Sequence, residues 1–195
     1  MISYKKVLFT GILGLTTVLL VGWFFSADTV KGDDVLVTAT VGAVTCSVDA
    51  TSTALGTLRT DQISTASPDI VATMACGSVP TGCTLYVNDA GDTSNPGLYS
   101  SGASYLVTST DATLSAGSEG YGIQATTTDP GWTINPKYVV TGTDVGGLTI
   151  GNTTYASSSS GLSTSTATTT HKAAIATTTP AGSYVDTITY SCTAN

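Results

Sequence analysis

Side-chain oxygens that could bind a metal ion are concentrated in the segment Asn88–Asn95. The four candidate ligands are Asn88, Asp89, Asp92 and Asn95. Carboxylate and amide oxygens are the ligands that Ca²⁺ prefers, although the segment lacks the EF-hand pattern and its terminal glutamate. Asp and Asn are also common in turns, where they stabilise the backbone, and we favour this plainer interpretation. We therefore expect no resident cofactor, with Ca²⁺ as the one candidate.

Few residues of the chain could act as catalysts. His171 is the sole histidine and follows a run of threonines, so we interpret it as a solvated loop residue rather than as a catalytic base. Glycosidase chemistry needs two facing carboxylates, but Glu119 is the sole glutamate and the aspartates lie mainly in turns. Asp186 differs, because strand alternation places it on an apolar face between Tyr184 and Ile188. We expect Asp186 at the end of a sandwich, accepting loop N–H bonds. We predict no catalytic residue and a protein that is not an enzyme.

Trp132 is the candidate for binding a ligand through an aromatic surface. It lies in the sequence Asp129-Pro-Gly-Trp, and a tryptophan on a loop could stack against a sugar ring, with Tyr99, Tyr105 and Tyr155 nearby. A tryptophan buried in the core of a sandwich is the commoner use of this residue, and we favour it. Carbohydrate binding remains the alternative function.

The four cysteines are Cys46, Cys76, Cys83 and Cys192. Their spacings contain no CxxC pair and do not resemble a zinc site. An even number of cysteines in an exported segment predicts two disulfides, for which the sequence allows three connectivities. We expect all four cysteines to be buried and bonded, because each shares a strand face with apolar neighbours.

The strands that would position these residues are indicated by apolar residues alternating with period two beyond residue 33. A long strand is expected over Val35–Val48, with a bulge at Gly42-Ala43 where the apolar face changes from odd to even numbers. Further strands are expected at Ile70–Cys76, Cys83–Val87 and Tyr184–Cys192. Weaker strands are expected near Tyr105–Thr108, Tyr121–Thr127, Tyr138–Thr141, Leu148–Ile150 and Lys172–Ala176.

Short strands separated by Gly and Pro turns, without helical periodicity, predict an all-β antiparallel β-sandwich. The segment 156–170 is almost wholly Ser and Thr, and we interpret it as a flexible surface loop. The strands on both sides of this segment are needed to complete one core. We therefore predict a single domain over 33–195.

The N-terminal residues 1–32 are expected to form a signal peptide or an uncleaved membrane anchor. Lys5 and Lys6 precede the uncharged segment Val7–Phe25, which is the arrangement of an export signal and would form one apolar helix. The lysines before this segment orient the remainder outward by the positive-inside rule. We expect the protein to be extracellular or on the cell surface, attached to the membrane through Val7–Phe25 if that segment is uncleaved.

The composition excludes a nucleic-acid partner. The chain has 6 Lys and Arg against 13 Asp and Glu, whereas binding to phosphates needs a basic face. The 39 Thr and 22 Ser displace the residues that form long helices. The hydrophobic content of 41% is enough to fill a core, which also excludes a wholly disordered chain.

Several segments together resemble the secreted pilin domains that include spore coat protein U-like proteins, and the last one also resembles WxL-type cell-wall surface domains. They are VTATVGAVTC over Val37–Cys46, LGTL over Leu55–Leu58, IVATMAC over Ile70–Cys76, CTLYVNDAG over Cys83–Gly91 and PAGSYVDTITY over Pro180–Tyr190. The resemblance implies an immunoglobulin-like surface subunit with a disulfide joining the positions of Cys46 and Cys76. A Cys83–Cys192 bond then follows by elimination, and Cys46–Cys192 with Cys76–Cys83 is the competing arrangement.

We expect a cell-surface structural or adhesion protein, pilin-like or part of a surface layer, whose partners are further copies or other surface components. Those pilins carry an extra N-terminal donor segment, whereas only Asp28–Asp34 lies between the apolar stretch and the first strand here. Four basic residues follow Ala27, so few positions on a sheet edge can carry a lysine that protects the edge against pairing with another chain. We therefore expect contacts between copies through strand addition at a terminal strand, most readily the long strand Val35–Val48.

Overall fold

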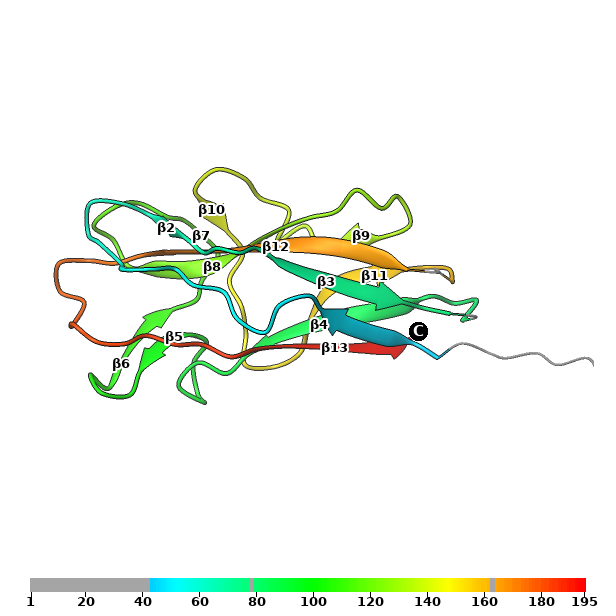
Figure 1. Cartoon of the computed structure of the whole chain (residues 1–195), viewed down its shortest axis with the longest axis horizontal. Helices are drawn as coiled ribbons and strands as arrows, with labels where there is room; N and C mark the ends of the chain where they lie inside the picture. The colour runs from blue at the N-terminus through cyan, green and yellow to red at the C-terminus, as the bar shows by residue number, and fades with distance from the viewer. Residues whose placement is uncertain (1–42, 78, 162–163) are drawn as a thin grey trace, which may run out of the picture. The chain divides into compact units, whose positions relative to one another are not determined.

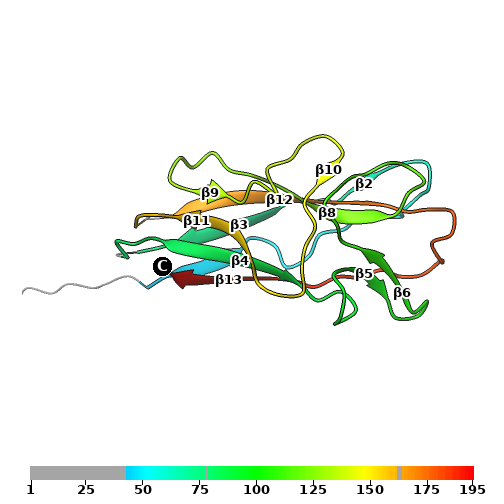
Figure 2. The same ribbon diagram turned by 180° about the vertical axis from the view of Figure 1, so that it is seen from behind.

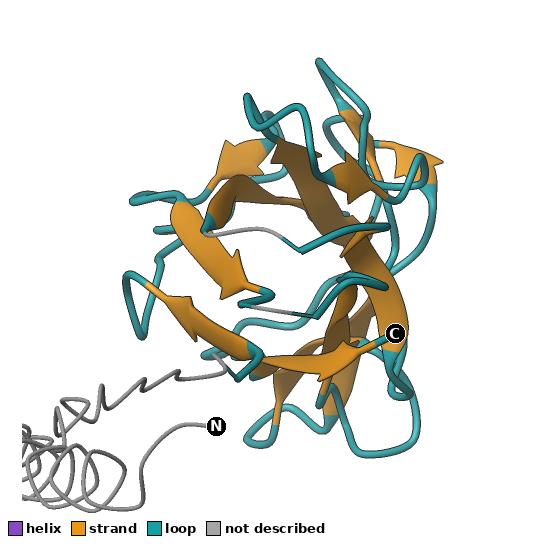
Figure 3. Cartoon of the chain, turned by 90° about the vertical axis from the view of Figure 1, so that its right-hand side faces the viewer, coloured by secondary structure: helices purple, strands orange, loops and turns teal. Residues whose placement is uncertain are grey.

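The computed structural model describes residues 43–77, 79–161 and 164–195, and in these residues it contains strands and no helix (Figures 1 and 3). Every pair of named strands is antiparallel, which confirms the predicted all-β antiparallel class. The expected N-terminal helix, the signal or anchor at 1–32 and Gly42 of the expected bulge lie outside the described residues. Within the described ranges, no helix is long and apolar enough to cross a membrane.

The first main sheet has the strand order β1–β3–β12–β2, and β8 also pairs with β12. Its strands are β1 (Thr45–Val48), β2 (Ser64–Thr65), β3 (Ile70–Ala75), β8 (Gly120–Thr126) and β12 (Ser165–Ala174). β1 forms one edge of this sheet.

The second main sheet has the strand order β13–β4–β11–β9, and Figure 2 shows it from behind. Its strands are β4 (Cys83–Asp89), β9 (Thr133–Ile134), β11 (Thr153–Ser158) and β13 (Ile188–Ala194). Two small two-stranded sheets complete the fold. They are β5 (Gly97–Ser100) with β6 (Tyr105–Thr108), and β7 (Ala112–Thr113) with β10 (Asp144–Val145).

The hydrophobic core lies between the inward faces of the two main sheets. In β3, Ile70, Ala72 and Met74 are buried while the residues between them are half-buried. In β4, Cys83, Leu85 and Val87 are all fully buried and belong to the same core cluster. The predicted period-two alternation is therefore confirmed, and it produces a sandwich-like packing because each strand contributes one apolar face.

The Ser/Thr-rich segment 156–170 is not the flexible surface loop that its composition suggested. β11 continues to Ser158 and β12 begins at Ser165, so most of the segment is paired strand. Thr169 shows why a Ser/Thr-rich composition does not require a surface loop. It is fully buried, and its hydroxyl is hydrogen-bonded to the hydroxyls of Tyr155 and Tyr190. Threonine has a high strand propensity, and a buried hydroxyl is tolerated where it finds partners.

The weaker predicted strands have mixed outcomes. β6 coincides with the predicted Tyr105–Thr108, and β8 lies within one residue of the predicted Tyr121–Thr127. The strand predicted at Lys172–Ala176 is the end of β12. No strand forms at Tyr138–Thr141 or Leu148–Ile150, where the chain follows turns and irregular backbone instead.

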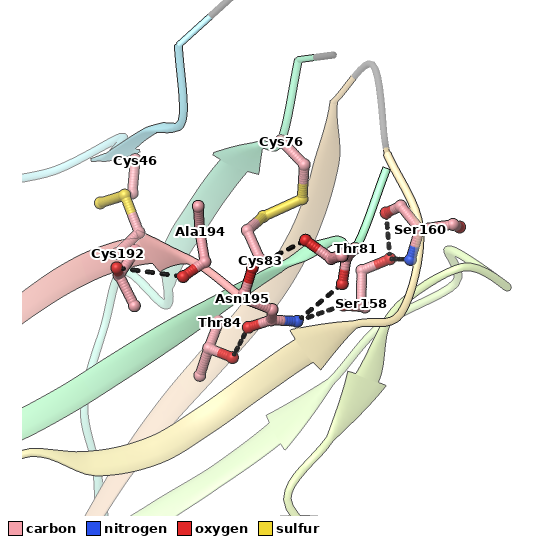
Figure 4. The surroundings of a disulfide bond; sticks show 11 residues. Cys46, Cys76, Thr81, Cys83, Thr84, Ser158, Ser160, Cys192, Ala194 and Asn195 are labelled. Atoms are coloured by element: carbon pink, nitrogen blue, oxygen red, sulfur yellow. Dashed lines mark hydrogen bonds between the residues drawn. A yellow bond between two sulfur atoms is a disulfide. The ribbon is translucent and has the colours of Figure 1, made fainter. Parts of the chain in front are cut away.

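The cysteines form two disulfides, Cys46–Cys192 and Cys76–Cys83, with Cα–Cα distances of 6.0 and 5.6 Å (Figure 4). The favoured pairing of Cys46 with Cys76 and of Cys83 with Cys192 is therefore wrong, and the competing arrangement is correct. The strand register explains the result, because β3 places Met74 opposite Cys46. Cys76 instead lies where the chain turns from β3 into β4, next to Cys83.

Candidate functional site

A groove of about 1210 Å³ lies between two irregular segments of the chain, residues 50–58 after β1 and residues 179–187 before β13. We call these segments the two groove walls. Residues of the strands also line the groove, and they are Val48, Ile70, Leu98, Tyr121, His171, Ile188 and Tyr190. The groove therefore combines apolar side chains with a small set of polar ones.

The groove walls take little part in sheet pairing. The first wall pairs through an isolated bridge between Ala54 and Ser67, and the second through a bridge between Val185 and Tyr99. Neither wall belongs to a named strand of the described chain. Most of the backbone N–H and C=O groups in the walls therefore form no sheet ladder, and such groups can pair with an added strand.

Two carboxyl groups meet at one end of the second groove wall. Asp89 ends β4 and is 2% exposed, and Asp186 is half-buried and lines the groove. Asp89 Oδ1 accepts the Gly97 N–H at 3.1 Å, and Asp186 Oδ1 accepts the Gly91 N–H at 3.3 Å. The expectation that Asp186 accepts a loop N–H is confirmed.

The two remaining carboxyl oxygens, Asp89 Oδ2 and Asp186 Oδ2, are both buried and form no hydrogen bond among the described residues. Asp89 pairs with Ile188 in the register of β4 with β13, and the Ala90 N–H donates to the Thr187 carbonyl at 3.0 Å, so Asp186 is the next residue along the same face and the two carboxyl groups are neighbours. Burial, reinforced by the Asp186 carboxyl, raises the pKa of Asp89 to about 8. Burial also raises the pKa of Asp186. Two carboxylates in contact repel each other, so the pair is stable where one of them carries a proton.

The loop that follows β4 requires glycine beside the carboxyl pair. Gly91 has a φ of +46°, and a Cβ at this position would lie 1.9 Å from the Asn95 carbonyl oxygen. A residue with a side chain would have to move the loop, and the Gly91 N–H would move with it. The turn geometry and the hydrogen bond to Asp186 therefore depend on the same glycine.

Tyr121 and His171 lie side by side at the groove. The Tyr121 hydroxyl is 3.0 Å from His171 Nδ1, and the two rings are stacked with centroids 6.2 Å apart. The interpretation of His171 as a solvated loop residue is wrong, because it faces inward from β12 and is 5% exposed. Burial lowers the pKa of His171 to about 4, so the imidazole is neutral at neutral pH.

Tyr121 is also close to the carboxyl pair. Burial, followed by the charges of Asp186 and Asp89, raises the pKa of Tyr121 well above its usual value. The sequence pattern marks Asp186 and His171 separately and does not connect them. Asp89 was missed as a buried residue, although it continues the inward alternation of Cys83, Leu85 and Val87.

The four predicted Ca²⁺ ligands are not brought together. Asn88 and Asp89 point to opposite faces of β4, and Asn88 Nδ2 donates to Asn152 Oδ1 at 3.0 Å. Asp92 Oδ1 accepts the backbone N–H groups of Ser94 and Asn95 at 2.9 and 2.6 Å, which is a turn-stabilising arrangement. No group of three or more His, Cys, Asp or Glu in the described ranges is placed to hold a metal ion.

Trp132 is a core residue in this structure. It is 4% exposed and belongs to the main hydrophobic cluster together with the fully buried Tyr155. Tyr105 lies elsewhere, with its hydroxyl hydrogen-bonded to Glu119 at 2.8 Å. Trp132 therefore offers no exposed aromatic platform to a sugar.

The fold and the groove define an antiparallel all-β domain with two disulfides and an open, mostly apolar groove between two irregular walls. No family model, curated protein or solved structure matches the chain.

Proposed function

We propose that the protein is an exported, non-enzymatic subunit of a cell-surface structure, and that its copies associate by adding a strand at the groove. In this proposal the domain is immunoglobulin-like and follows an N-terminal signal or anchor. The two disulfides support export, because such bonds form and persist in oxidising compartments. The apolar segment Val7–Phe25 behind two lysines supports the same compartment.

The observation that carries this proposal is the pair of groove walls, which belong to no named strand and pair through one isolated bridge each. β1 and β13 are edge strands of the two main sheets, and each wall is continuous with one of them. Added strands pair through main-chain hydrogen bonds at an open edge, and pockets for alternate side chains select the sequence. The groove supplies both features.

The chemistry of the groove suits an apolar strand. Its lining contains aliphatic and tyrosine side chains with hydroxyl-bearing residues on the walls, and no lysine or arginine. Val185 of the second wall is 65% exposed, an unusually exposed position for a large aliphatic side chain. A lysine at such an edge position is a common protection against strand addition, and this wall has none.

The test compares Val185→Lys with the matched control Val139→Lys in the full chain. Val139 is 56% exposed and does not line the groove, so both changes add one charge at an exposed valine. Size-exclusion chromatography with light scattering across a concentration series should show self-association of the original chain and of Val139→Lys. The association of Val185→Lys should be weaker by at least about tenfold, because a charged side chain opposes apolar strand docking.

Electron microscopy of the same samples reports whether the associated species are filaments or layers. A strictly monomeric original chain at high concentration, without filaments, would contradict the proposed function. Equal weakening by both lysine variants would show that the groove is not the contact surface.

A further inference from the structure

The Asp89–Asp186 pair connects three parts of the fold. Asp89 ends β4 and holds the Gly97 N–H at the start of β5. Asp186 belongs to the second groove wall and holds the Gly91 N–H in the loop between β4 and β5. The wall backbone is also bonded on either side of Asp186, by the Val185–Tyr99 bridge and by the Ala90 N–H, which donates to the Thr187 carbonyl at 3.0 Å. The carboxyl pair therefore adds a titratable side-chain link to a wall that backbone hydrogen bonds also hold.

No positive charge accompanies the pair within the described ranges. The salt bridges found there are Arg59–Asp61 and Lys137–Asp111, and neither involves the pair. The titratable group that faces the pair is Tyr121 of β8, which interacts with Asp186. His171 of β12 lies behind Tyr121, and Tyr190 of β13 also acts on Tyr121. The His171 imidazole is neutral and both phenols are uncharged at neutral pH. An attractive contact between the two buried carboxyl groups thus requires a proton.

We infer that Asp89 and Asp186 share one proton and form a pH-sensitive latch, which holds the second groove wall against the end of β4 while the proton is bound. When the proton is lost, two negative charges face each other in a buried site, and the opening equilibrium of the wall shifts toward the released state against the backbone bonds that also hold it. The effect of the latch on association rests on the proposed function, because the released wall borders the groove where a strand would be added. The latch itself is a property of the single domain.

The direction of the pH effect follows from the two states of the wall. The closed wall binds the shared proton up to about pH 8, whereas a released, solvated aspartate loses its proton near its usual pKa of about 4. Between these values each pH unit favours the released wall by up to about tenfold. The opening equilibrium should therefore rise by up to about a hundredfold from pH 5 to pH 7.

Amide hydrogen exchange of peptides covering 179–187 measures this opening in the full chain. The Asp89→Asn variant removes the titration and keeps the contact, because its amide can donate to Asp186 Oδ2 and its oxygen can accept the Gly97 N–H. The ratio of opening in the original chain to opening in Asp89→Asn cancels the intrinsic pH dependence of exchange. This ratio should rise by between about tenfold and a hundredfold from pH 5 to pH 7.

The matched control is Asp92→Asn, which changes an exposed aspartate in the same loop. Its ratio to the original chain should stay constant with pH, because the Asp92 carboxylate is bound by the N–H groups of its own turn. Asp186→Asn provides a second neutral variant with the same expected behaviour as Asp89→Asn. It keeps the test decisive if Asp89→Asn does not fold.

Carbon-13 NMR of the aspartate carboxyl carbons detects the proton directly. One carboxyl group of the pair should titrate near pH 8 in the original chain, and this titration should be absent from both Asp89→Asn and Asp186→Asn. Two carboxyl groups titrating near pH 4, or a pH-independent exchange ratio, would overturn the latch. So would protection of 179–187 that depends on added CaCl₂ and disappears with EDTA, because a cation would then hold the pair.

These measurements follow the wall inside one domain, so their outcome does not depend on assembly. A monomeric chain with a pH-dependent wall would support the latch and contradict the proposed function. A chain that assembles, but whose wall opening does not depend on pH, would support the proposed function and contradict the latch.

Discussion

Cys46 and Cys192 are 146 residues apart in the sequence, yet their Cα atoms lie 6.0 Å apart and their sulfurs are bonded. The bond joins β1, an edge of the first main sheet, to β13, an edge of the second. Cys76–Cys83 closes a connection of only 7 residues between β3 and β4. The first disulfide thus fixes the distance between two edges, and the second fixes a turn.

Replacing both Cys46 and Cys192 with alanine should destabilise the domain more than replacing both Cys76 and Cys83. The chain-entropy estimate gives about 5 kcal/mol for the long loop and about 2.5 kcal/mol for the short one. Urea unfolding of the two double variants measures the difference in the free energy of unfolding. A larger loss from the Cys76–Cys83 pair would show that packing at these buried sites outweighs loop entropy.

The free energy of unfolding should depend on pH in two opposed ways. The raised pKa of the Asp89–Asp186 pair gives stability that is complete below about pH 4 and is lost as pH rises to about 8. The lowered pKa of His171 gives stability that is complete above about pH 6.5 and is lost as pH falls to about 4. Each slope is at most about 1.4 kcal/mol per pH unit. The original chain should show nearly constant stability from pH 4 to 6.5 and a decline from 6.5 to 8.

Single variants separate the two contributions. In Asp89→Asn only the His171 contribution should remain, so the free energy of unfolding should rise from about pH 4 to 6.5 and then stay constant. In His171→Gln only the carboxyl contribution should remain, so the free energy of unfolding should fall from about pH 4 to 8. Urea unfolding at a series of pH values measures both profiles. A decline above pH 6.5 that persists in Asp89→Asn would assign it to other groups.

Thr169→Val should destabilise the core although the two side chains have nearly the same shape. The Thr169 hydroxyl bonds the Tyr155 hydroxyl at 2.6 Å and the Tyr190 hydroxyl at 3.2 Å. Losing it leaves two buried or half-buried hydroxyls without this partner, at a cost of about 2–4 kcal/mol in unfolding free energy. Thr168→Val on the other face of β12 is the control and should change stability by less than about 0.5 kcal/mol. Adding Tyr155→Phe to Thr169→Val should recover part of the loss.

Trp132→Ala should lower the free energy of unfolding by about 3–5 kcal/mol, as expected for a large core side chain. Trp132→Phe should cost less, because it keeps a buried ring and removes the indole N–H, which has no partner in the described part of the chain. Chemical denaturation measures both variants. If Trp132→Ala lowered the free energy of unfolding by less than about 1 kcal/mol, Trp132 would lie at the surface, and this result would favour the carbohydrate-binding alternative.

The inward and outward faces of the main strands could be predicted from the sequence. Ile70, Ala72 and Met74 are buried as the alternation indicated, and Cys83, Leu85 and Val87 are buried in the same way. Composition was a poorer guide, because Ser and Thr are common both in loops and on strands. The first part of β12, from Ser165 to His171, and the burial of His171 were missed for this reason.

Alternation determines which way a side chain points because successive residues of a pleated strand face opposite sides, whatever the strand packs against. The sequence by itself therefore established the all-β class, the apolar environment of the cysteines and the unusual position of Asp186. Only the tertiary structure decided which residues meet: Cys46 with Cys192, Asp89 with Asp186, and Tyr121 with His171. Each partner lies on a distant strand, and strand order and register depend on the packing of the whole core, which no local pattern contains.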